Sequence, residues 1–142
     1  MEAQELHRGR LIDHLQLVVR DLPASRKFYG AVLEVLGIPI GGDGASYFWA
    51  DELFVSSADS EAALGRLTGR HHLAFQARDR ATVEAFYEAG LVNGGRDNGA
   101  PGERPYHPGY FAAFLLDPDG NNIEAVFHGV AERSAPSVRI NF

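Results

Sequence analysis

The chain has 142 residues, no cysteine and a formal net charge of −6 at pH 7. Its length suits one domain, and 45% apolar with 23% charged residues is ordinary for a soluble globular protein. The lack of cysteine excludes disulfides and thiolate metal sites. The net negative charge argues against nucleic-acid binding, because that function needs clustered basic residues. No signal-peptide h-region or run of ~20 apolar residues is present, so we expect a cytoplasmic protein with no membrane partner.

An internal repeat is the most informative feature of the sequence. Two segments align without a gap at an offset of 58 positions, which indicates a duplicated structure. The identical pairs are His14/His72, Leu15/Leu73, Arg20/Arg78, Asp21/Asp79, Phe28/Phe86, Tyr29/Tyr87, Ala31/Ala89, Leu33/Leu91 and Gly37/Gly95.

The first copy opens with a strand-like run over 11–19 and continues into a helix. Asp21 is a good N-cap, an apolar stripe follows, and Gly37 can end the helix in a left-handed conformation. The paired aromatics, Phe28 and Tyr29, predict packing of this helix on a sheet. Extended runs are then expected over 37–40, 46–50 and 53–56, with a glycine-rich turn over 41–44.

The second copy repeats this pattern, with a strand from residue 72 and a helix capped by Asp79. A glycine- and proline-rich stretch over 94–109 follows this helix, and strands are then expected over 110–116 and 122–127. The turn Asp117-Pro118-Asp119-Gly120 joins these two strands. We therefore predict one α+β domain of paired βαβββ modules, at 10–57 and 70–129, whose mixed β-sheet forms a cleft with the helices outside.

Strand alternation assigns the polar residues of the predicted strands to one face. An approximate twofold between the copies would place His14 and His72 symmetrically around the cleft, where Glu124 of the last strand joins them. Two imidazoles and a carboxylate suit Fe, Mn, Zn or Ni, so we predict one divalent metal ion. The alternative is that each histidine is a hydrogen-bonded strand residue. Gln16 and Gln76 share this face and are candidate substrate-binding residues.

The loop over 104–110 is rich in functional groups and leads into a strand of the predicted cleft. His107 is a candidate general acid or base, since an imidazole titrates near neutral pH. Tyr110 is a candidate catalytic residue, and Tyr106 and Arg104 are candidate substrate-binding residues. The alternative is a turn with surface aromatics. His128, at the end of the last strand, is interpreted as structural.

The sequence resembles the vicinal-oxygen-chelate superfamily of glyoxalase I, extradiol dioxygenases, fosfomycin-resistance enzymes and bleomycin-binding proteins. The resemblance covers roughly residues 10–129 and implies that His14, His72 and Glu124 fall on metal-ligand positions. The motifs that carry it are Asp13-His14-Leu15, Arg20-Asp21-Leu22, Phe28-Tyr29, His72-Leu73-Ala74-Phe75 and the segment from Asp117 to Glu124.

Departures from the superfamily patterns leave the activity open. Glyoxalase I usually takes a fourth ligand from the last strand of the first module, but only Glu52 stands at the entry to that strand. Phe114 replaces the tyrosine of extradiol dioxygenases, and Gln16 replaces the threonine of fosfomycin enzymes.

The resemblance implies a metal-dependent enzyme for a small substrate with vicinal oxygens, of lyase, isomerase or dioxygenase type. The alternative is a ligand-sequestering protein of the bleomycin- or fosfomycin-resistance type, with or without metal. The resemblance also implies a homodimer.

Overall fold

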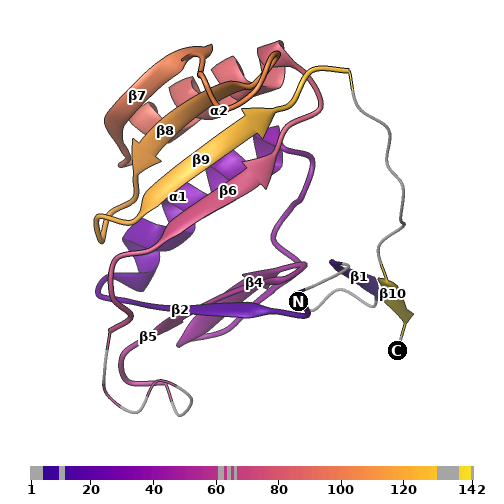
Figure 1. The fold of residues 1–142 in the computed structure, drawn as a ribbon. Helices are drawn as coiled ribbons and strands as arrows, with labels where there is room; N and C mark the ends of the chain where they lie inside the picture. The colour runs from indigo at the N-terminus through magenta and orange to yellow at the C-terminus, as the bar shows by residue number, and fades with distance from the viewer. Residues whose placement is uncertain are drawn as a thin grey trace. The chain divides into compact units, whose positions relative to one another are not determined.

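The computed structural model describes residues 5–9, 12–60, 63, 65, 67–130 and 138–141 of an α+β protein, as predicted (Figure 1). Within this part of the chain, no helix is both long and apolar enough to cross a membrane. The elements are β1 (Glu5–Arg8), β2 (Leu15–Val19), α1 (Leu22–Val35), β3 (Gly42–Asp43), β4 (Tyr47–Ala50), β5 (Leu53–Ser57), β6 (His72–Gln76), α2 (Arg80–Val92), β7 (Arg96–Glu103), β8 (Phe111–Leu116), β9 (Asn122–Phe127) and β10 (Val138–Asn141).

The strand order confirms the predicted repeat. One four-stranded sheet has the order β2-β5-β4-β3 and the other the order β6-β9-β8-β7. In each sheet the first strand of the module pairs in parallel with the last, β2 with β5 and β6 with β9, and the remaining pairs are antiparallel. The βαβββ unit is therefore used twice. Strands β1 and β10 form a separate antiparallel pair.

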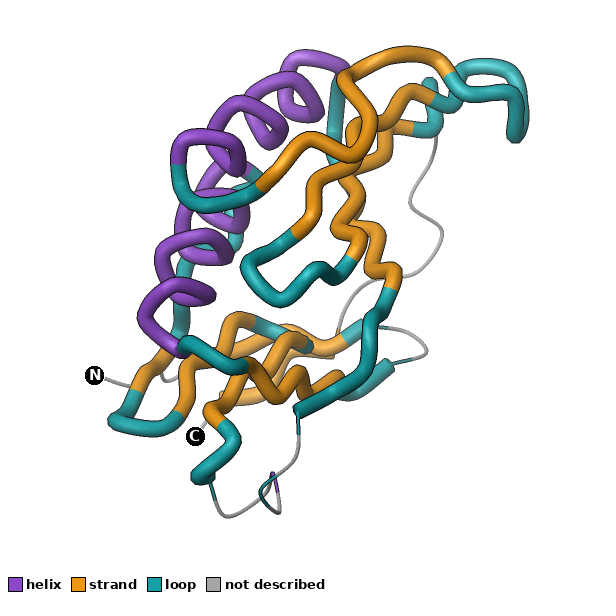
Figure 2. Tube along the Cα trace, turned by 90° about the vertical axis from the view of Figure 1, so that its left-hand side faces the viewer, coloured by secondary structure: helices purple, strands orange, loops and turns teal. Residues whose placement is uncertain are grey.

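The elements group into two compact units. The first unit contains the β2-β5-β4-β3 sheet and the β1–β10 pair, and the second contains the β6-β9-β8-β7 sheet with nearly all of α1 and the whole of α2. Both helices lie on the same face of the second unit's sheet (Figures 1 and 2). Helix α1 thus follows β2 in sequence but packs with the strands of the second copy.

Three of the four paired aromatics of the repeat pack as predicted, whereas Tyr87 is half-buried. Phe28, Tyr29 and Phe86 have no exposed surface. Helix α2 approaches β8 closely at Gly90, where an added Cβ would lie 2.1 Å from Leu115 Cδ1 and 3.3 Å from the ring of Phe28. Only glycine leaves room for both helices and the sheet to meet at this point.

The turn between β8 and β9 is built around a fully buried carboxylate, Asp117. One of its oxygens accepts hydrogen bonds from the backbone N–H groups of Asp119 (2.9 Å) and Asn121 (2.8 Å). The other accepts from the Asn121 amide at 2.8 Å and from the Tyr29 hydroxyl of α1 at 2.5 Å. Burial, and then the Asp117 charge, raise the pKa of Tyr29 well above its usual value, so the hydroxyl remains a donor.

The extended segments differ from the sequence-based expectations at two places. Residues 38–40 form no strand, and the short strand β3 lies instead in the glycine-rich stretch expected to be a turn. Strand β7 lies within the glycine- and proline-rich stretch 94–109, for which the sequence indicated no particular strand. Glycine and proline are tolerated there because β7 is an edge strand with irregular register against β8.

The Tyr29 hydroxyl should contribute measurably to stability. Replacing Tyr29 by Phe removes one donor from the buried Asp117, so we expect a loss of about 1–3 kcal/mol in the free energy of unfolding, measured by urea denaturation. Tyr87 is the repeat counterpart of Tyr29, and its hydroxyl bonds the exposed Asp97 at 2.8 Å. The control Tyr87→Phe should therefore cost roughly 0.5 kcal/mol or less. Equal losses in the two variants would contradict this account.

Candidate functional site

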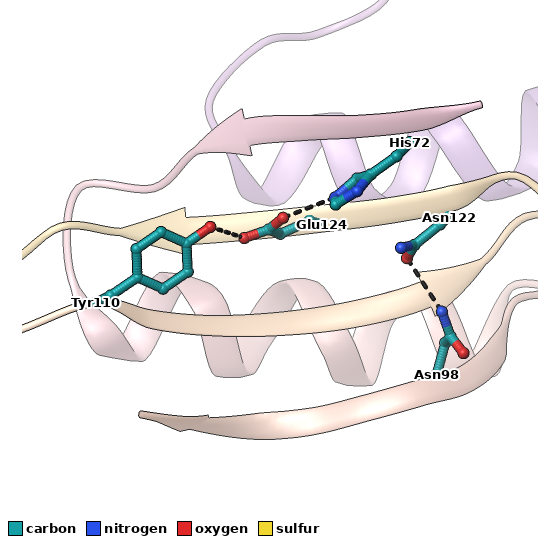
Figure 3. A network of polar contacts seen from close by, with 5 residues as sticks. All are labelled: His72, Asn98, Tyr110, Asn122 and Glu124. Carbon is teal, nitrogen blue, oxygen red and sulfur yellow. Dashed lines mark hydrogen bonds and ion pairs between the residues drawn. The ribbon is translucent and has the colours of Figure 1, made fainter. Parts of the chain in front are cut away.

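The centre of the candidate site is Glu124, a carboxylate in β9 that is only 2% exposed. Nε2 of His72, from β6, lies 2.8 Å from Glu124 Oε1. The hydroxyl of Tyr110, just before β8, donates a hydrogen bond to Oε2 (Figure 3). Both carboxylate oxygens therefore have a partner, and the structure brings together three of the predicted site residues.

The parallel pairing of β6 and β9 explains this geometry. Ala74 lies opposite Glu124 in the register, and His72 is two positions before Ala74 on the same strand face. His72, Ala74 and Gln76 are all exposed, whereas Leu73 and Phe75 between them are less so. The predicted alternation of β6 is thus confirmed, and Gln76 lies on the face that carries His72.

The environment of Tyr110 keeps its phenol protonated. Burial, followed by the hydrogen bond to Glu124 and the charge of Glu124, raises the pKa of Tyr110 from 10.0 to about 12. The carboxylate disfavours the phenolate because both would be negative. At neutral pH the hydroxyl is therefore a hydrogen-bond donor that fixes the orientation of Glu124.

Four aromatic side chains cluster beside this carboxylate. The Tyr110 ring makes edge contacts with Tyr106, His107 and His128, at centroid distances of 4.9, 5.3 and 5.3 Å. His107 Nε2 lies 2.9 Å from His128 Nδ1. The predicted residues Tyr106 and His107 are thus linked to Tyr110, and Tyr106 is 68% exposed.

The hydrogen bonds of the imidazole pair define its tautomers. A backbone carbonyl only accepts, so Nδ1 of His107, 2.8 Å from the Pro108 carbonyl oxygen, carries a proton. In the neutral ring, Nε2 of His107 then accepts from Nδ1 of His128. Nε2 of His128 is consequently the nitrogen of this pair that keeps an available lone pair.

Four further side chains connect to this face of the second sheet. The ring of Phe114, in β8, contacts the His72 ring edge-on with a centroid distance of 6.0 Å. The predicted residue Arg104 contacts the same ring, with Cζ 5.3 Å from the Phe114 centroid. Asn98 of β7 donates a hydrogen bond of 3.1 Å to Asn122 of β9 (Figure 3).

The remaining predicted residues, His14 and Gln16, belong to the first unit. His14 is exposed and directly precedes β2, with Nδ1 2.7 Å from Asp13 Oδ1, which leaves its Nε2 available as a ligand. Gln16 donates a hydrogen bond of 2.8 Å to Ser56 Oγ. Within either unit, the described residues include no group of three or more metal-ligating side chains. The predicted triad needs both units and stays a prediction.

Sequence reasoning gave no functional role to His128, Phe114, Asn98 or Asn122. Alternation along the last strand could have indicated His128, because it is four positions after Glu124 and so shares its face. Asn122 is two positions before Glu124 in β9 and therefore lies on the same strand face. No sequence signal identifies Asn98, since it lies in a glycine- and proline-rich stretch without clear side-chain alternation.

The pKa of Tyr110 provides a test of its contact with Glu124. Glu124→Gln removes the negative charge beside the phenol, so we expect the pKa to fall from about 12 toward 10.0 while the burial contribution remains. The measurement is a pH titration of the tyrosine ring carbons by NMR, with Tyr110→Phe used to assign the signal. An unchanged pKa in Glu124→Gln would mean that the two groups are not in contact in solution.

The tautomers of the imidazole pair can be observed directly. At alkaline pH, long-range proton–nitrogen NMR should show both His107 and His128 protonated on Nδ1. Replacing His107 by Gln removes the acceptor, so His128 should then show a mixture of tautomers. A His107 ring protonated on Nε2 in the unsubstituted protein would contradict the hydrogen-bond pattern.

The comparisons with known proteins agree with this architecture. The model of the Glyoxalase/Bleomycin resistance protein/Dioxygenase superfamily matches residues 11–125. A glyoxalase/bleomycin resistance protein from Albidiferax ferrireducens T118 is 31% identical, with a TM-score of 0.69 and 82% of this chain and 97% of that chain covered. No curated protein matches the chain.

Two more distant structures share the fold. A glyoxalase/bleomycin resistance protein/dioxygenase family enzyme from Burkholderia phytofirmans PsJN is 20% identical, covers 80% of this chain and 95% of its own, and has a TM-score of 0.62. A lactoylglutathione lyase from Agrobacterium tumefaciens is 18% identical, covers 83% and 93%, and has a TM-score of 0.58. Because the family model spans most of both repeat copies, the chain belongs to the Glyoxalase/Bleomycin resistance protein/Dioxygenase superfamily.

Proposed function

We propose that this protein is a metal-dependent enzyme that acts on a small substrate with adjacent oxygens. One divalent ion would be held by His72 and Glu124 of the second unit and by His14 of the first. The observation that carries the proposal is the pair formed by His72 Nε2 and Glu124 Oε1, 2.8 Å apart on a partly exposed sheet face.

The chemistry of this pair fits a metal ion. Nitrogen and oxygen ligands bind Zn²⁺ at roughly 2.0–2.2 Å, so two ligands of a tetrahedral ion lie roughly 3.4 Å apart. His72 Nε2 and Glu124 Oε1, now 2.8 Å apart, would separate by only about 0.6 Å to bind the same ion. A buried carboxylate is costly unless a cation or hydrogen bonds compensate it. Among the described residues, Glu124 is hydrogen-bonded to an imidazole and a phenol, and neither carries a permanent positive charge. A divalent ion would supply the missing charge.

The proposed third ligand is also oriented for this role. Asp13 accepts a hydrogen bond from Nδ1 of His14, which is the arrangement that leaves Nε2 of a ligating histidine free for a metal. Two imidazoles and one carboxylate suit Fe, Mn, Zn or Ni and leave coordination positions for a substrate. When bound, such an ion polarises the substrate oxygens that coordinate it.

The chain's own residues would orient the substrate and transfer protons around this ion. Tyr110 holds the Glu124 carboxylate in place through its hydroxyl. The His107–His128 pair would exchange protons with the substrate through Nε2 of His128, with His107 setting the tautomer. Gln16, Gln76 and the exposed Tyr106 would contact the substrate. Both lyase or isomerase chemistry and ring-opening oxygenation are compatible with these roles, and oxygen uptake with catechols after anaerobic Fe(II) loading distinguishes them.

Metal binding by metal-stripped protein tests the proposal. Calorimetric titration with Zn²⁺, Ni²⁺, Mn²⁺ and Fe²⁺ should show one site for at least one ion, and free metal at 100 times Kd should stabilise the fold by about 2.7 kcal/mol. His72→Ala and His14→Ala should each weaken binding strongly because each removes a ligand. His71→Ala, at the neighbouring exposed position, is the matched control and should bind like the unsubstituted protein. Equal metal content with and without His72 would refute the proposal.

The ligand-sequestering alternative makes a different prediction for the same protein. It requires a small molecule that stabilises the fold in the presence of a chelator as strongly as in its absence. Stabilisation that disappears on metal removal supports the enzyme. Stabilisation that persists supports sequestration.

A further inference from the structure

Two glycines of β7, Gly99 and Gly102, leave space for the Arg104 guanidinium beside the strand. A Cβ at Gly99 would lie 3.3 Å from Arg104 Nη2 and 3.0 Å from Phe114 Cδ2, and a Cβ at Gly102 would lie 3.0 Å from Arg104 Nη1. Gly99 also has a φ of 147°, which side-chain-bearing residues rarely adopt. Both glycines therefore leave space that the guanidinium occupies.

The guanidinium is held in place by contacts that do not neutralise it. Nη2 donates to the Ala100 carbonyl oxygen at 2.7 Å, and Nη1 donates to the Glu103 carbonyl oxygen at 3.4 Å. Cζ lies 5.3 Å from the Phe114 ring centroid, within the range of a cation–π contact. The neighbouring carboxylate of Glu103 is paired with Arg80 at 2.7 Å. Among the described residues, no carboxylate forms an ion pair with Arg104.

Arg104 is positioned next to the proposed metal ligands. Phe114 lies directly opposite Glu124 in the β8–β9 register, so the two side chains are neighbours on one face of the sheet. The Phe114 ring also contacts His72. Arg104 and His72 thus contact the same aromatic ring, and Arg104 offers further N–H donors in a planar fork.

We propose that Arg104 binds the carboxylate of the substrate, and that the substrate is a small organic acid whose adjacent oxygens lie about one ring away from that carboxylate. The role of the adjacent oxygens rests on the proposed function, whereas binding of the carboxylate does not. A guanidinium that is already ordered matches the two oxygens of a carboxylate and loses little freedom on binding. Phe114 would support the apolar part of the molecule between the two ends.

Binding of a matched pair of probes tests this inference. The probes are 3,4-dihydroxybenzoate and its methyl ester, which keep the adjacent oxygens and differ in the charge of the carboxyl group. Calorimetry on the metal-loaded protein should show the acid binding about 10- to 100-fold more tightly than the ester, as expected for hydrogen bonds to a charged group. Arg104→Gln should abolish this preference. Arg96→Gln changes an exposed arginine of the same strand and should retain it.

Two additional binding measurements test the role of Arg104 independently of the metal proposal. With a chelator present, benzoate should still bind more tightly than methyl benzoate in an Arg104-dependent manner, even if the protein proves to bind no metal. Phenylphosphonate, compared with benzoate, tests the type of anion. The inference is overturned if neither acid is preferred over its ester, if Arg104→Gln keeps the preference, or if the phosphonate binds more tightly than the carboxylate. Thermal unfolding of each variant near that of the unsubstituted protein confirms that the fold is intact.

Discussion

The Glu124 carboxylate is buried within the second sheet, and the candidate site is arranged around the need to compensate it. Strand β9 lies between β6 and β8, so each neighbouring strand can supply one partner. His72 comes from β6, and Tyr110 comes from the segment that enters β8. An unpartnered carboxylate at this position would be strongly destabilising, because the interior solvates charge poorly. The geometry of His72 and Tyr110 is therefore a requirement of the fold as well as a feature of the site.

A second buried carboxylate, Asp117, holds the strands that carry this site. Its hydrogen bonds close the turn at which β9 begins and attach that turn to Tyr29 of α1. Since the turn fixes the register of β8 against β9, it also places Phe114 opposite Glu124. Phe114 in turn contacts both His72 and Arg104. A hydrogen-bonded turn at one end of the two inner strands thus determines which side chains meet on the sheet face that carries the site.

The two halves of the repeat keep the same strand order but differ in their chemistry. Gln16 lies opposite Phe54 in the first sheet, at the position where Ala74 lies opposite Glu124 in the second. Phe54 is therefore the counterpart of Glu124, and the first half has no equivalent carboxylate. The repeated tyrosines differ similarly, because Tyr29 bonds the buried Asp117 whereas Tyr87 bonds the exposed Asp97. Both halves therefore keep the same strand order, whereas most polar side chains of the candidate site belong to the second half.

The βαβββ repeat and the common face of His72 and Glu124 could be predicted from the sequence, because an ungapped 58-residue offset and side-chain alternation can both be read along the chain. Long-range packing, in contrast, attaches α1 to the second sheet and forms an edge strand within the glycine-rich stretch, and neither could be predicted. The tertiary structure alone paired Tyr110 with Glu124, His107 with His128, and Arg104 with Phe114. These contacts depend on strand register and on the path of the loop, which are set by the packing of residues distant in sequence.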